Sequence, residues 1–120
     1  MSSSGGVIRR FEEPDEHRSA ESWAFEVVTL GGMTLGRASY EPGWRWSVDV
    51  GPQVGTASCQ VDHVGLVVSG RCAVAMDSGE YLEMSPGDLF AIPPGHDSWV
   101  LGDEPYVSIH LLGAEKYARK

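Results

Sequence analysis

The feature of this 120-residue chain that most constrains its fold is the regular spacing of its turn residues. From Trp23 onward, short apolar runs are separated by groups such as Gly31-Gly32 and Ser85-Pro86-Gly87, at intervals of roughly 8 to 12 residues. The chain has 15 glycines and 7 prolines, more than a helical bundle of this length tolerates, because both residues interrupt helices. The pattern predicts a many-stranded β structure with almost no helix.

The apolar runs predict strands at residues 24–30, 33–41, 44–50, 55–61, 64–69, 71–77, 80–84, 89–92, 97–101 and 105–112. Their connections are short, so neighbouring strands must pair antiparallel. We therefore expect an all-β fold, an antiparallel β-barrel or jelly roll, over residues 23–113. Residues 1–22 are expected to form a polar, partly disordered N-terminal arm, and residues 114–120 a C-terminal tail.

Charge and cysteine content restrict the partners and the compartment. Nine basic residues against 17 acidic ones give a formal net charge of −8. We therefore expect neither a nucleic-acid partner nor an anionic membrane partner. No apolar run spans a bilayer and no signal-peptide layout begins the chain, so we expect a cytoplasmic protein. In that reducing compartment Cys59 and Cys72 should be free thiols, Cys72 as core filler. An exposed edge strand or the arm favours a homodimer.

Three residues with metal-binding side chains lie beside predicted turns. Cys59 and His63 would be roughly 13 Å apart in a straight strand, so they can share an ion only if the chain bends between them. The Pro93-Pro94-Gly95 turn places His96 at the start of the next strand. One thiolate and two imidazoles suit zinc first, and iron or copper next, with one coordination position open. The alternative is that Cys59 binds no metal and fills space in the core as a small apolar side chain.

A ligand pocket is expected on the inner face of the same sheets. Trp44, Trp46, Val48 and Val50 share one face by period two, and should pack in the core or line a pocket. Ser98 shares the face of His96. Further candidates supply polar groups: Tyr40 and Tyr106 as hydroxyl donors, and His110 as a fourth metal ligand or a partner to one.

The residues from Gly87 to Trp99 resemble the second motif of the cupin superfamily: Gly, five residues, Pro, one residue, Gly. The turn Val67-Val68-Ser69-Gly70-Arg71, with Asp77-Ser78-Gly79-Glu80 after it, resembles the end of the first motif. The resemblance covers about residues 34–113, and the sequence of the motifs is similar to that of small single-domain cupin-2 proteins. It implies a small antiparallel β-barrel that holds a divalent metal inside.

The chain departs from the family at the places where the resemblance puts metal ligands. His63 stands at the usual glutamate, Cys59 at the second histidine, Ala57 at the first, and Ser98 at the histidine of the second motif, with His96 two residues earlier. Two functions therefore stay open. The favoured one is a metal-dependent enzyme, of isomerase, cyclase, lyase or oxygenase type, acting on a small organic molecule inside the barrel. The alternative is a non-catalytic metal- or ligand-binding module, such as a sensor.

Overall fold

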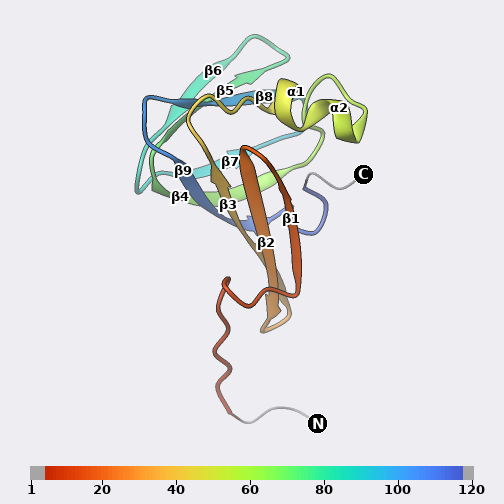
Figure 1. Cartoon of the computed structure of the whole chain (residues 1–120), viewed down its shortest axis with the longest axis vertical. Coiled ribbons are helices and arrows are strands. Elements are labelled where there is room, and N and C mark those ends of the chain that lie inside the picture. The colour runs from red at the N-terminus through yellow and green to blue at the C-terminus, as the bar shows by residue number, and fades with distance from the viewer. Residues whose placement is uncertain (1–4, 118–120) are drawn as a thin grey trace.

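Two antiparallel β-sheets form most of the protein in a computed structural model that describes residues 5–117 (Figure 1). The larger sheet has the strand order β1-β2-β3-β9-β4-β7, and the smaller one the order β6-β5-β8. The strands are β1 (Glu16–Ala20), β2 (Trp23–Leu30), β3 (Met33–Tyr40), β4 (His63–Ser69), β5 (Arg71–Met76), β6 (Tyr81–Met84), β7 (Leu89–Ile92), β8 (His96–Leu101) and β9 (Tyr106–Leu112). Short helices α1 (Trp46–Asp49) and α2 (Gly51–Val54) join β3 to β4.

The all-β prediction is confirmed, and the sheets form a jelly roll that is not closed into a barrel. Glycines make two of its connections possible. Gly31 and Gly32 have φ of 59° and 78° and close the two-residue hairpin between β2 and β3. Gly70 joins β4 to β5 at φ 74°, where a Cβ would collide with the Pro105 carbonyl oxygen. At that position the chain passes from one sheet to the other.

The strand predicted at residues 44–50 is wrong, because this segment contains helix α1. Trp46 and Val50 are buried and four residues apart, a spacing that fits both a strand face and one turn of helix. Val48 decides between them, since it is 67% exposed and not on the inner face. The Asp97 carboxylate of β8 accepts the Ser47 backbone N–H at 2.9 Å, which satisfies one unpaired donor at the start of the helix.

The strand predicted at residues 55–61 is also wrong, because only Cys59 in this segment makes a β-bridge, with His96. Conversely, residues 16–20 of the expected polar arm form β1, which pairs along its whole length with β2. Its alternation of polar residues gives no apolar period. The strand exists because its backbone completes the hydrogen-bonding edge of β2 and because Arg18 binds the C-terminal turn.

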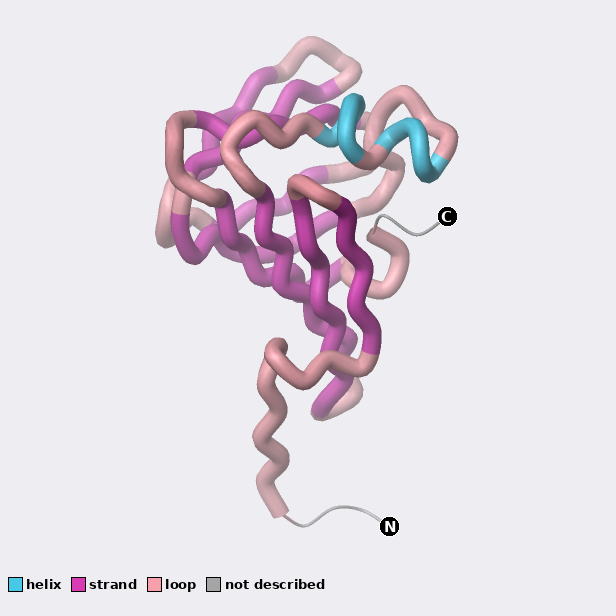
Figure 2. Tube along the Cα trace, in the orientation of Figure 1, coloured by secondary structure: helices cyan, strands magenta, loops and turns pink. Residues whose placement is uncertain are grey.

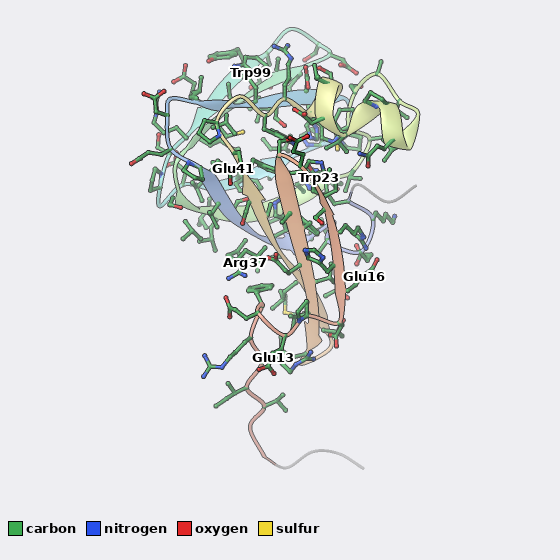
Figure 3. The ribbon with its side chains drawn as sticks, viewed as in Figure 1. Glu13, Glu16, Trp23, Arg37, Glu41 and Trp99 are labelled. Atoms are coloured by element: carbon green, nitrogen blue, oxygen red, sulfur yellow. The ribbon has the colours of Figure 1, made fainter. Side chains whose placement is uncertain are left out.

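The segment before β1 lies beside the end of the sheet that carries the β2–β3 hairpin, and its N-terminal part leads away from the sheets (Figure 2). Arg37 of β3 forms ion pairs with Glu12 at 2.7 Å and with Glu26 at 3.0 Å, and its guanidinium lies over the Phe11 ring (Figure 3). The division of the chain into arm, domain and tail stays a prediction, and residues 118–120 of the tail lie outside the described residues. No helix within residues 5–117 is long and apolar enough to cross a membrane.

Candidate metal centre

Cys59, His63 and His96 converge at one end of the core. The candidate ligand atoms of the three side chains all lie within 4.8 Å of one another, and the Cys59 Sγ lies 3.5 Å from the His63 Nε2. All three residues are buried, at 1%, 4% and 4% exposure. The donor set is the one that the sequence predicts, and its spacing suits a single ion.

The convergence depends on how residue 59 is attached to the smaller sheet. The Cys59 N–H donates to the His96 carbonyl at 2.7 Å, and the Cys59 carbonyl accepts the Gly95 N–H at 2.7 Å. Cys59 is thereby fixed beside the first residue of β8, while the chain turns through Gln60 and Asp62 to begin β4 at His63. The expected bend between Cys59 and His63 is present. Cys59, however, does not end a regular strand, because it makes only an isolated β-bridge.

Hydrogen bonding orients one of the imidazoles. The His96 Nδ1 lies 2.8 Å from the Pro93 carbonyl oxygen, which can only accept, so Nδ1 carries the proton and Nε2 keeps its lone pair. A carbonyl that holds the second ring nitrogen is the usual support of a metal-binding histidine. The Pro93-Pro94-Gly95 turn therefore both places His96 and sets its tautomer.

Burial also controls the charge of the three ligands. Loss of hydration lowers the pKa of His63 well below its usual value, and the neighbouring His110 and His96 lower it further. Burial likewise lowers the pKa of His96. For Cys59, burial raises the thiol pKa to about 11. At neutral pH the metal-free protein thus presents two neutral imidazoles, ready to coordinate, and one protonated thiol.

A small cavity of about 40 Å³ adjoins the two histidines. Of the predicted pocket residues, five line this cavity: Tyr40, Trp46, Ser98, Tyr106 and His110. Trp44 does not line it. Its ring instead stacks on Tyr40, with the centroids 3.8 Å apart, and is 1% exposed, which is the core-packing alternative. A volume of this size holds water rather than an organic molecule in the conformation described.

His110 is inside, but it is not part of the converging set. Its Nε2 lies 3.1 Å from the Ser108 Oγ on the same strand, and its ring centroid lies 5.1 Å from that of His63. Burial lowers the pKa of His110 to about 4, so the ring is neutral at pH 7. His110 thus packs beside His63, and its ring nitrogens are not among the ligand atoms that converge.

Sequence reasoning missed Tyr117, which follows β9 in the expected tail. The residue is 3% exposed, lines the cavity, and its ring centroid lies 5.4 Å from that of His63. A single tyrosine near the end of a polar segment carries no periodic signal that could have identified it. Cys72, in contrast, is a free, buried thiol in the core as expected.

No protein-family model and no curated protein matches the chain. Solved structures do. A protein of unknown function from Rhizobium leguminosarum bv. viciae is 23% identical, with a TM-score of 0.64 over 90% of this chain and 96% of that one. KdgF from a Halomonas species is 19% identical, with a TM-score of 0.63 over 95% and 97%. A putative ethanolamine utilization protein EutQ from Salmonella typhimurium is 15% identical, with a TM-score of 0.51 over 77% and 70%.

KdgF and EutQ have the cupin fold, and at these identities the likeness concerns the fold alone. The chain therefore has a cupin-like jelly roll, with a possible metal site of one cysteine and two histidines at one end of its core.

Proposed function

We propose that this chain is a small metal-binding cupin of the cupin-2 type, which holds one divalent ion through Cys59, His63 and His96. The observation that carries the proposal is the convergence of the three ligand atoms within 4.8 Å, with His96 brought to Cys59 and His63 from 33 positions further along the chain. A thiolate with two imidazoles favours zinc, and iron or copper next.

The surroundings of the three residues fit a metal. Both imidazoles are kept neutral by burial, and Pro93 holds the proton of His96 on the nitrogen away from the site. A metal held by Cys59, His63 and His96 would leave one position for water or substrate and would supply Lewis-acid chemistry there. The protein's own residues orient His96, exclude bulk water and leave one proton, on Cys59, to be displaced.

The function we favour is a metal-dependent enzyme that acts on a small organic molecule beside the metal. Polar groups of Tyr106, Ser108 and His110 lie on the inner face of β9 and line the same cavity as His63. They are placed to hydrogen-bond a substrate and to exchange protons with it. The reaction would be of isomerase, cyclase, lyase or oxygenase type.

A non-catalytic metal-binding module is the second candidate, and the size of the cavity favours it. About 40 Å³ admits water but no organic substrate, so a cavity of this size by itself fits a metal sensor or carrier. The two functions are distinguished by whether the cavity can open enough to admit an organic molecule.

Metal content tests the proposal. The purified full chain, supplemented with zinc and then dialysed, is expected to retain one zinc per chain by elemental analysis. His63→Ala and His96→Ala should each lose most of it, because two protein ligands hold zinc far more weakly than three. His17→Ala, at an exposed histidine of β1, is the matched control and should retain the metal.

Cobalt identifies the thiolate. The cobalt-loaded protein should show a sulfur-to-metal charge-transfer band that Cys59→Ser abolishes and Cys72→Ala leaves in place. Unchanged metal content in both histidine variants, or no metal retained by the wild-type chain, would refute the site.

A further inference from the structure

A single arginine holds the C-terminal turn, residues 113–117, against the body of the protein. Arg18 of β1 donates to the carbonyl oxygens of Ala114 at 3.1 Å, Glu115 at 3.2 Å and Tyr117 at 2.6 Å. Its guanidinium also pairs with Glu16 at 2.8 Å, which holds it in position. The β4–β9 ladder ends at Leu112, so the turn can leave without breaking a strand pair.

The turn inserts Tyr117 into a box of four aromatic rings. The ring centroids of Phe25, His63, His110 and Tyr40 lie 4.8, 5.4, 6.1 and 6.4 Å from that of Tyr117. The Tyr40 hydroxyl donates to the Tyr117 hydroxyl at 2.6 Å. One wall of this box is a candidate metal ligand, so the phenol ring of Tyr117 occupies the space beside the metal centre.

The cavity that adjoins the box has polar atoms without partners. Within residues 5–117, the Trp46 Nε1, the His63 Nδ1 and the His110 Nδ1 are buried and form no hydrogen bond. All three residues line the cavity. Buried polar atoms are costly unless they are paired, so a lining of this kind indicates a compartment built for a polar guest. With Tyr117 inserted, the compartment is too small for a guest molecule larger than water.

We propose that residues 113–117 are a gate which Arg18 holds closed, and that Tyr117 occupies the place of the ligand, a hydroxylated aromatic ring of about the size of phenol. When the gate opens, the ring of the ligand replaces that of Tyr117 in the aromatic box, and its hydroxyl takes the hydrogen bond of Tyr40. That this ligand is a substrate rests on the proposed function, whereas the gate itself does not.

The backbone provides a pivot for such a movement. Gly113 follows β9 directly and has φ of 93°, a conformation that other residues rarely adopt. The turn beyond it is closed by N–H groups of Lys116 and Tyr117 that donate to the Gly113 carbonyl at 3.2 and 3.1 Å. Rotation about Gly113 can therefore move the turn and its tyrosine as one unit. Lys116 of the turn and Cys59 line the same hollow, so we expect the same movement to uncover the Cys59 thiol.

Alkylation of Cys59 measures the gate in metal-free protein. In a Cys72→Ala parent, Cys59 is the sole cysteine of the chain, and its reaction with iodoacetamide at pH 8 reports how often the turn opens. Arg18→Ala is expected to raise the rate by about tenfold or more, because the turn loses its charge-assisted hydrogen bonds. Arg71→Ala removes a comparable ion pair, to Glu83 on the other sheet, and should leave the rate unchanged.

General destabilisation is the main competing explanation, and Val100→Ala controls for it. This substitution removes core packing on β8, away from the turn. Arg18→Ala must accelerate alkylation more than Val100→Ala does. A rate for Arg18→Ala no higher than that of the parent, or no higher than that of Val100→Ala, overturns the gate.

The class of ligand is tested by filling the vacated box. In metal-free Tyr117→Ala, 4-methylphenol is the probe, because it is the tyrosine side chain alone. It should raise the melting temperature in a saturable manner, and toluene, which lacks the hydroxyl for Tyr40, should bind about tenfold more weakly. Absence of 4-methylphenol binding, or equal binding of toluene, overturns the assignment of the ligand.

If Tyr117→Ala does not fold, Arg18→Ala provides the same test, because it keeps Tyr117 but loosens the turn. There 4-methylphenol should compete with Tyr117 and shift the NMR resonances of Phe25 and Tyr40 in a saturable manner, and no shift overturns the assignment. Neither measurement uses metal, so failure to bind zinc would refute the proposed function while leaving the gate, and the converse also holds.

Discussion

Zinc binding should release one proton from the protein, and that proton should come from Cys59. Burial raises the pKa of this thiol to about 11, whereas the coordinating species is the thiolate. The two histidines contribute no proton at neutral pH, because burial lowers the pKa of both. Zinc binding is therefore coupled to the titration of the thiol. The sequence alone would suggest coupling to the titration of the imidazoles instead.

The size of the effect follows from the distance between the thiol pKa and the working pH. A thiol with a pKa of about 11 lies four units above pH 7, and at 1.36 kcal/mol per unit its deprotonation costs about 5.4 kcal/mol of the zinc-binding free energy. The apparent dissociation constant should fall about tenfold for each unit of pH between 6.5 and 8.5, where one proton is displaced.

Two measurements check the coupling. Competition with a chelator of known affinity gives the dissociation constant at pH 6.5, 7.5 and 8.5, and calorimetry in buffers of different ionisation enthalpy counts the protons directly. Cys72→Ala, which removes the other buried thiol, should keep the same slope. A dissociation constant that does not change with pH would show that Cys59 is not the ligand or is already ionised. A slope of two or more would show that the imidazoles are protonated and would refute the burial argument.

Three further predictions concern stability and assembly. The pKa of His110 is about 4 in the folded protein and 6.5 in the unfolded chain, so the unfolded chain takes up the proton first as pH falls. Up to about 3.4 kcal/mol of the free energy of unfolding is therefore lost between pH 6.5 and pH 4. Urea unfolding of metal-free protein measures this loss, and His110→Gln should remove it. Gly65→Ala should lower the free energy of unfolding by about 3 kcal/mol or more, because its Cβ meets the Ile109 carbonyl oxygen across the β4–β9 pair. Gly6→Ala, in open space, should leave that free energy unchanged. If the expected dimer forms through the outer face of β7, Leu89→Asp should convert it to monomers, because this side chain is 79% exposed on that face. Sedimentation at high micromolar concentration measures this, and a variant that remains as dimeric as the wild-type chain would exclude that face.

The strand-and-turn plan was predictable because it rests on local chemistry. Glycines that accept positive φ, as at Gly31 and Gly70, mark the ends of strands wherever they stand in the fold. The three candidate ligands were predictable for a similar reason, since residue type and the nearby turns are properties of the chain itself. Their convergence could be stated only as a condition, because the bend after Cys59 is held by backbone hydrogen bonds to His96, 37 positions further along.

Tertiary structure alone decided the remaining features. The spacing of Trp46 and Val50 fits a strand and a helix equally. The helix is supported by the Ser47 N–H, which donates a hydrogen bond to the Asp97 carboxylate of a distant strand. β1 forms because β2 offers it an unpaired edge, although its own residues have no apolar period. Tyr117 becomes a wall of the candidate site because Arg18, 99 positions earlier, holds its backbone. Contacts of this kind join residues far apart in the chain, and only the folded structure brings them together.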